Sequence, residues 1–176
     1  MRHARTLRPA LAGLLAGAAL ALPVVAQEAV ATDAAAAQVE TALDAVGAWR
    51  ADPLVILDAA EVDLADFQWI ARPVVVFANS PLDPAFAEQM EAIAVEGDRL
   101  AERDVVVIVD TDPAARSAIR TKLRPRGFML ALIAKDGQVN LRKPIPWTVR
   151  ELSRSIDKMP IRQREIRDRP RVAADG

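Results

Sequence analysis

Cysteine and tyrosine are absent from the sequence, and its single histidine is His3. Because a thiolate is the reactive form of cysteine, the absence of cysteine excludes thiol redox chemistry, and it excludes disulfides as well. Zinc sites built from cysteine and histidine lack their ligands. A serine nucleophile of the Ser-His-Asp type lacks its histidine base. Carboxylates, lysine, arginine and serine remain as the side chains available for catalysis.

The apolar run near the N-terminus, Ala10 to Leu22, is too short to cross a bilayer core of roughly 30 Å as a helix. Three arginines precede it, a proline follows it, and small residues stand at the position where a signal peptidase cuts. We therefore predict a cleaved secretory signal over residues 1–26, ending at Ala26, and a periplasmic or secreted mature chain without a transmembrane segment. An uncleaved anchor is the alternative interpretation of this pattern.

The sequence also lacks an excess of either charge: it has 23 basic and 24 acidic residues, and its formal net charge is −1. The predicted signal carries arginines and no acid, so the rest of the chain is mildly acidic. This balance argues against nucleic acid as a partner. The length of 176 residues suits one domain. Such a chain can bury roughly two thirds of its unfolded surface, which makes a single core sufficient without disulfides.

Beyond the signal, three further segments divide the chain. Residues 27–52 form an alanine-rich exit segment, in which Val39 to Trp49 has the apolar spacing of a short helix. Residues 53–160 carry the pattern of a folded domain, and residues 161–176 form a charged C-terminal tail. Within the domain, strands are predicted over residues 53–59, 72–78, 104–110, 128–134 and 139–142, and helices after Asp83-Pro84, Asp112-Pro113 and Trp147.

The order of these elements predicts an α/β fold with a central mixed sheet and flanking helices. Residues 72–78 and 104–110 are continuous apolar runs, typical of strands covered on both faces, and the helical crossover between them makes them parallel. The turn at Asp136-Gly137 makes the last two strands an antiparallel hairpin. A parallel βαβ unit, an antiparallel hairpin and a closing helix form the thioredoxin layout. Pro53 places the first strand at an edge.

Three segments carry a resemblance to one family: LADFQW…RPVVVFA, LAERDVVVIVD and IAKDGQVNLR…IDKMPIRQREIR. Together they resemble an uncharacterised bacterial domain-of-unknown-function family, with MPIRQREIR as the most specific piece. That family is thioredoxin-like and related to the DUDES group, which comprises equarin, the sushi-repeat proteins SRPX and SRPUL, and the coiled-coil protein URB. It is similar to peroxiredoxins in architecture but lacks their cysteine pair. The resemblance implies a fold and an exported location, without a defined activity.

The junction between the second strand and its helix is where proteins of the thioredoxin type hold their reactive cysteines. Here it reads Ala78-Asn79-Ser80-Pro81-Leu82. The proline that precedes the third strand in thioredoxins is also missing, because Gly127-Phe128 occupies that boundary. We expect the junction to be a structural corner, with Asn79 and Ser80 as candidate binding residues.

Acidic residues form the first candidate site. Ligands of parallel sheets bind at the carboxyl ends of the strands, and Asp83, Asp110 and Asp112 follow two such ends. Oxygen ligands of this kind suit Ca²⁺ or Mg²⁺, although no motif requires a cofactor. VVVIVDTDP also shares the strand-plus-DxD opening of haloacid-dehalogenase phosphatases, without their later acidic pair. The simpler interpretation is that Asp83 and Asp112 cap the helices that start at the following prolines.

Basic residues form two further candidate binding sites. Arg116, Arg120, Lys122, Arg124 and Arg126 occur with no acid among them, which suits an anion or lipid headgroup as well as a solvated helix face. In the tail, Arg162, Arg164 and Arg167 are candidates for binding a partner, and a solvated helix end is the alternative. The tryptophans Trp49, Trp69 and Trp147 are expected in the core.

These observations predict an exported, cysteine-free, thioredoxin-like protein that binds a protein partner in the periplasm as a non-catalytic module or adaptor. The alternative is a carboxylate-based enzyme that depends on a divalent metal ion held at the acidic strand ends.

Overall fold

The computed structural model describes residues 45–168. The predicted signal, most of the exit segment and the last residues of the predicted tail lie outside the described residues. The predicted short helix is present over residues 45–51, and its Trp49 is buried and donates a hydrogen bond from Nε1 to the carbonyl of Val105 at 3.0 Å. None of the helices within residues 45–168 combines the length and the apolar composition that a bilayer span requires.

Five strands form one mixed sheet in the order β1-β3-β2-β4-β5. Strands β1, β3 and β2 are parallel, whereas β4 pairs antiparallel with both β2 and β5. This arrangement confirms the predicted α/β fold with a thioredoxin-like topology, including β1 at the edge. The strands are β1 (Ile56–Asp58), β2 (Arg72–Phe77), β3 (Val105–Asp110), β4 (Met129–Ile133) and β5 (Val139–Lys143).

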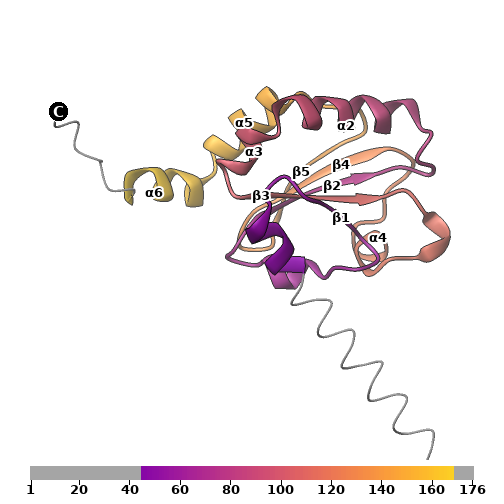
Figure 1. Ribbon diagram of the computed structural model, residues 1–176, viewed down its shortest axis with the longest axis horizontal. Helices are drawn as coiled ribbons and strands as arrows, with labels where there is room; N and C mark the ends of the chain where they lie inside the picture. Colours follow the sequence, from indigo (N-terminus) through magenta and orange to yellow (C-terminus); the bar gives the residue numbers. More distant parts are fainter. Residues whose placement is uncertain (1–44, 169–176) are drawn as a thin grey trace, which may run out of the picture.

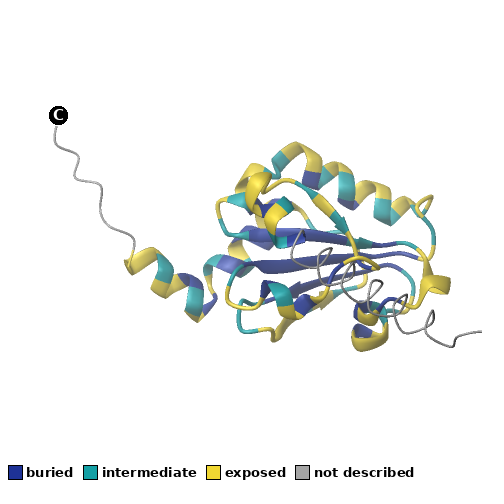
Figure 2. Cartoon of the chain, turned by 60° about the horizontal axis from the view of Figure 1, so that its bottom comes forward, coloured by how far each residue is buried: buried dark blue, intermediate teal, exposed yellow. Residues whose placement is uncertain are grey.

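The three central strands owe their position to continuous apolar sequence. Every residue of β2 and β4 is buried, and so are all but one residue of β3 (Figure 2). Alternate side chains enter two apolar clusters, so that Val75 packs on one face of the sheet and Val74 on the other. Full burial of such a side chain contributes about 1.5–3 kcal/mol, which makes these runs the main source of stability.

Helices cover both faces of the sheet (Figure 1). One face carries α2 (Pro84–Glu96), α3 (Asp98–Ala101) and α5 (Val149–Asp157). The other face carries the helix at residues 45–51, the 3-10 turns η1 (Leu64–Phe67) and η2 (Pro113–Ala115), and α4 (Ala118–Leu123). Gly97 separates α2 from α3, and a Cβ there would meet the carbonyl oxygen of Ile93 at 2.9 Å.

The predicted helix starts are confirmed by side-chain caps. Asp83 accepts a hydrogen bond from the backbone of Ala85, and Asp112 accepts one from Ala114. Thr148 and Glu151 form a capping box at the start of α5. Hydrogen bonds from the Thr148 hydroxyl and backbone hold the pKa of Glu151 below its usual value.

Two local predictions are wrong. A single helix was expected after Asp112-Pro113, but η2 ends at Arg116, which adopts a left-handed conformation with φ 48°, and Ser117 then caps α4 anew. Trp69 was expected in the core, yet it is 65% exposed. Its backbone is left-handed, with φ 63°, and its N–H bonds to the carbonyl of Lys135, which turns the residue away from the core.

The last helix, α6 (Pro160–Asp168), begins the segment for which the sequence predicts a charged tail. Its attachment is ionic. Glu165 accepts hydrogen bonds from Arg72 at 2.8 Å and from Arg162 at 3.3 Å, and its carboxylate lies 3.0 Å from the Lys135 ammonium. We call these residues, together with Asp104, the Arg72 network. Arg72 is fully buried, so the pairing compensates for the cost of removing its charge from water.

The pKa of Glu165 reflects this setting. Burial acts to raise it, but hydrogen bonds from Lys135 and Arg72 and the charges of both outweigh burial, so the pKa of Glu165 lies below its usual value. A carboxyl whose pKa is lowered by folding contributes stability that is complete above its unfolded pKa, about 4.3. That contribution is lost as the pH falls through the lowered folded pKa.

We predict that Glu165→Gln lowers the free energy of unfolding at neutral pH by about 2 kcal/mol, because two charged hydrogen bonds are weakened around buried Arg72. Below about pH 4 the difference from wild type shrinks, since wild-type Glu165 then becomes protonated. Urea unfolding at several pH values measures both effects. The matched control is Glu88→Gln on the exposed side of α2, and equal stability of the two variants would contradict the role of Glu165.

Candidate functional site

The strand-end edge is the place where the fold would hold a ligand, because the carboxyl ends of β2 and β3 lie side by side there. Phe77, the last residue of β2, is in register with Asp110, the last residue of β3. The backbone N–H of Ala78 donates to the carbonyl of Asp110 at 2.9 Å, which continues the pairing one residue past the strand. The predicted candidates Asn79, Ser80, Asp83 and Asp112 follow in the two loops.

Asp110 is buried and bound within a compact cluster of three side chains. The hydroxyl of Ser117 donates to its Oδ2 at 2.6 Å, and Arg120 donates to its Oδ1 from Nε at 2.9 Å and from Nη2 at 2.6 Å. Asp110 is 4% exposed. We call Asp110, Ser117 and Arg120 the Asp110 cluster. Both oxygens of the carboxylate are occupied by protein donors.

Arg120 also binds the backbone at the strand ends. Its Nη2 donates to the carbonyl of Ala78 at 2.7 Å and to that of Asp110 at 2.9 Å, and its guanidinium lies 5.5 Å from the ring centroid of Phe77. One side chain from α4 therefore joins the ends of β2 and β3. The structure assigns Arg120, a member of the predicted basic run, to the interior of the fold rather than to an anion-binding surface.

The remaining acidic candidates act as local caps. Asp83 caps α2 and Asp112 caps η2, as described above. Within residues 45–168, no three histidine or acidic side chains gather in a way that could hold a metal ion. The structure therefore does not bring Asp83, Asp110 and Asp112 together as a ligand set, and the metal hypothesis gains no support from their geometry.

The loop after β2 is polar and open. Asn79 is exposed, and the Ser80 hydroxyl accepts a hydrogen bond from the backbone of Leu82 at 3.1 Å, which shapes the turn into α2. Leu82 is 88% exposed at the tip of this loop. Neither polar residue approaches the Asp110 cluster through a hydrogen bond in the described part of the chain. The junction has the role of a structural corner.

The three arginines predicted as a binding group do not share one surface. Arg162 is 5% exposed and donates to the carbonyl of Glu102 at 3.2 Å as well as to Glu165. Arg164 and Arg167 are exposed on α6. The helix therefore has a buried ionic side, which attaches it to the fold, and a cationic side that faces solvent.

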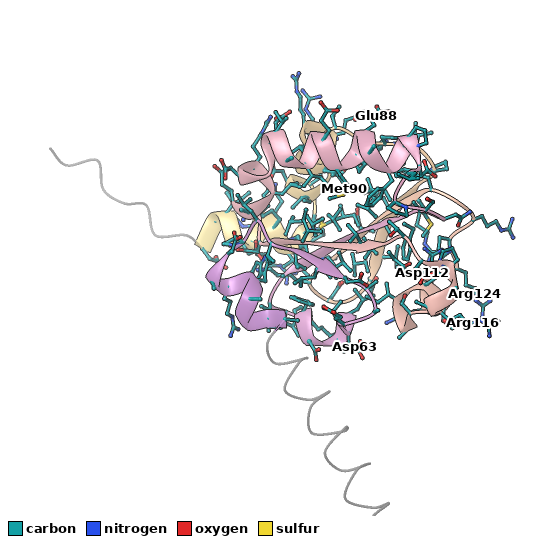
Figure 3. The ribbon with its side chains drawn as sticks, turned by 45° about the vertical axis from the view of Figure 1, so that its right-hand side comes forward. Asp63, Glu88, Met90, Asp112, Arg116 and Arg124 are labelled. Carbon is teal, nitrogen blue, oxygen red and sulfur yellow. The ribbon has the colours of Figure 1, made fainter. Side chains whose placement is uncertain are left out.

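A pocket of about 240 Å³, which no sequence motif predicts, lies at the same end of the sheet as the strand-end loops. Phe128, Met129 and Pro144 provide its apolar lining. Its cations are Arg124, Arg126, Arg142 and Lys143. We call this site the basic pocket. Figure 3 shows Arg124 and Arg116 together at this end of the molecule, near Asp112.

The pairing register of the β4–β5 hairpin is the feature from which the basic pocket could have been predicted. Lys143 pairs with Leu130 and Arg142 pairs with Ala131, so the end of β5 lies beside the start of β4. The predicted basic run leads directly into the start of β4 through Arg124 and Arg126. Two cationic segments that are separate in the sequence therefore meet at one place.

Similar solved structures are peroxiredoxins of Plasmodium species. The reduced 2-Cys peroxiredoxin of Plasmodium vivax is 17% identical with a TM-score of 0.47, over 58% of this chain and 84% of that chain. Thioredoxin peroxidase I of Plasmodium yoelii is 15% identical with a TM-score of 0.43, over 64% and 86%. The mitochondrial 2-Cys peroxiredoxin of Plasmodium falciparum is 20% identical with a TM-score of 0.36, over 55% and 79%.

No curated protein matches the sequence significantly. The fold assignment rests on the strand order of the sheet itself. Residues 63–165 match the family described as Domain of unknown function (DUF4174). The match includes the corner after β2, the Asp110 cluster, the basic pocket and Glu165, and it extends over more than half of the sequence. The chain belongs to the DUF4174 family.

Proposed function

We propose that the protein is a non-catalytic binding or adaptor module of the cell envelope, and that its partner is an acidic protein surface contacted by α6. The protein has a thioredoxin-like fold and no cysteine, so it lacks the thiol that peroxidase chemistry of this fold requires. The observation that carries the proposal is the two-sided character of α6. One side is held by buried ion pairs, and the other presents exposed arginines.

The corner of the fold supports a non-catalytic role. A general acid or base needs an unoccupied side chain within reach of a substrate. Asp110 is instead buried and bonded to Ser117 and Arg120. Asp83 and Asp112 are occupied as helix caps. The polar groups at the strand ends therefore stabilise the fold.

The geometry of α6 supports a binding role. Arg162 and Glu165 attach the helix to the domain, and α6 extends away from the sheet (Figure 1). Arg164 and Arg167 are three residues apart and therefore lie on one side of the helix. Ile166 beside them is 46% exposed. Guanidinium groups bind carboxylates in bidentate geometry, and a helix that is already held in place loses little conformational entropy on binding.

Export is part of the proposal and rests on the sequence of residues 1–26. The apolar run that ends at Leu22 and the small residues before Gln27 have the pattern of a cleaved signal. The absence of cysteine is compatible with an oxidising compartment, because the fold needs no disulfide.

We predict that the protein isolated from its native host begins at Gln27. Intact-mass measurement and N-terminal sequencing of the isolated chain test this directly. The substitution Ala26→Arg should block cleavage and leave the longer chain, because signal peptidases need a small side chain before the cut. A chain that retains residues 1–26 in the wild type would contradict cleavage after Ala26.

We predict that Arg164→Ala with Arg167→Ala abolishes capture of the partner in a crosslinking pull-down from envelope extract. The fold should be unaffected, because both side chains are exposed. The matched control is Arg150→Ala with Arg154→Ala on α5, which removes the same charge from another exposed helix. Arg162 is left intact because it is buried. If wild type and both variants capture the same proteins, or none, α6 is not the binding surface.

We predict that Asp110→Asn lowers the free energy of unfolding by about 3 kcal/mol, because it leaves the guanidinium of Arg120 without its buried partner. Asp112→Asn keeps a side-chain oxygen that can cap η2 at an exposed position, so it should change the free energy of unfolding by less than about 0.5 kcal/mol. Millimolar Ca²⁺ or Mg²⁺ should not raise the melting temperature of the wild type. A metal-dependent rise that Asp110→Asn abolishes would favour the metal-enzyme alternative instead.

A further inference from the structure

We propose that the basic pocket binds a phosphate group attached to a short apolar chain. The site lies apart from α6 and does not depend on the adaptor role proposed above. It is built from the loop between α4 and β4 and from the end of β5. Three features of the pocket support this assignment: its positive charge without ion-pair partners, its apolar floor and its size.

No carboxylate within residues 45–168 forms an ion pair with a cation of the basic pocket, although the charge of Lys143 acts on Glu151. Its lining includes four cations and no acidic residue. Arg124 and Arg126 make no ion pair with any residue from 45 to 168. This contrasts with Arg72 and Arg120, whose carboxylate partners lie within 2.8 Å. Like charges held together repel one another, so an anion bound among them lowers the electrostatic free energy.

The other two cations are placed by contacts that leave donors available. Arg142 donates from Nη1 to the carbonyl of Leu123 at 3.1 Å, which satisfies the C-terminal end of α4 and leaves the other nitrogens of the guanidinium. Lys143 lies over the ring of Trp147, 4.2 Å from its centroid, and its charge also acts on Glu151 of α5. These contacts orient both side chains at the pocket without burying their charges.

The backbone between α4 and β4 shapes the cationic rim. Arg124 ends α4 in a left-handed conformation with φ 51°, and Gly127 is left-handed with φ 80°. A left-handed conformation is unfavourable for a side chain such as that of arginine, and it is maintained here by the hydrogen bond from the Arg124 N–H to the carbonyl of Arg120. The two bends make the loop compact, so that Arg124 and Arg126 both line the pocket.

The floor of the basic pocket distinguishes it from a solvated basic surface. Phe128 and Met129 are each 9% exposed and are fixed at the start of β4, and Pro144 forms the wall at the end of β5. Ile145, the next residue in the chain, is 60% exposed. A ligand with an apolar chain beside its charge can bury that chain here, whereas a free inorganic anion cannot use this surface.

Charge and size together select the ligand class. Arginine forks match phosphate oxygens in bidentate geometry, and a phosphate monoester carries close to two negative charges at neutral pH, more than a carboxylate. Pockets for larger ligands have volumes of roughly 300–1,000 Å³. With about 240 Å³, the basic pocket has room for a phosphate and only the first few carbons of its chain. Such a group is present in soluble alkyl phosphates and in phosphatidic acid headgroups.

The first experiment measures binding of butyl phosphate to the full chain by isothermal titration calorimetry. We expect saturable binding to the wild type, and binding weaker by on the order of a hundredfold when Arg124→Ala and Arg126→Ala are combined, since each charged hydrogen bond contributes on the order of tenfold. Lengthening the alkyl chain from ethyl to butyl should tighten binding roughly two- to fourfold per methylene. Arg164→Ala with Arg167→Ala removes the same charge from α6 and should leave binding unchanged.

The second experiment distinguishes the two sources of the ligand. Cosedimentation with phosphatidylcholine vesicles containing phosphatidic acid is compared with vesicles of phosphatidylcholine alone. Binding that requires phosphatidic acid and is lost in the Arg124/Arg126 variant supports a membrane lipid as the source. Butyl phosphate binding without vesicle binding supports a soluble phosphate ester.

Three results would overturn the proposal. The first is that neither butyl phosphate nor the phosphatidic acid vesicles bind. The second is that pentanoate binds as tightly as butyl phosphate, which would exclude selection for phosphate. The third is that the α6 variant loses binding as much as the pocket variant, which would indicate only a general effect of net charge. Melting temperatures of both variants verify that each is folded, and the pull-down with α6 variants is unaffected by any of these outcomes.

Discussion

The buried guanidinium of Arg72 is the interaction on which the arrangement of the whole chain depends. It stands at the first position of the central strand β2 and is fully buried. It donates to the carbonyl of Arg103 at 2.8 Å, just before β3, and to Glu165 on α6. An isolated charge in this position would be very unfavourable, so the strand order, the α3–β3 turn and the attachment of α6 have to form together. One side chain thus connects three segments that are far apart in the sequence.

A buried ion pair between an arginine and a carboxylate lies at each end of the parallel strands. At their amino ends Arg72 binds Glu165, and at their carboxyl ends Arg120 binds Asp110. The Asp110–Arg120 pair occupies the carboxyl ends of the strands, where an α/β protein could otherwise hold a ligand or a catalytic group. The two proposed recognition sites lie elsewhere, on the exposed side of α6 and at the basic pocket beside β4. A thioredoxin-like fold without cysteine lacks the thiol that electron transfer of this fold requires, and both proposed binding sites lie outside the strand-end edge.

Much of the fold could be predicted because its signals are local. The runs from Arg72 and Val105 are continuous and apolar, the turn at Gly137 requires a positive φ that glycine provides, and Asp83 caps the helix that starts one residue later. The candidate site was predicted less well. Asp110 appeared to be a metal ligand because its two donors, Ser117 and Arg120, are brought to it only when α4 packs against the sheet. Arg162 appeared exposed because its partners lie on distant segments.

The sequence by itself determined the absence of thiol chemistry, the apolar strands, the caps and the hairpin, since composition and short-range periodicity carry that information. Only the tertiary structure decided which charges are buried in pairs and which remain available to a ligand. The 23 lysines and arginines cannot be told apart in the sequence, but the pairing of one with a carboxylate depends on a few ångströms of separation across the fold. Arg120 and Arg124 illustrate the difference: both belong to one basic run, yet one joins two strand ends and the other lines an open, positively charged pocket.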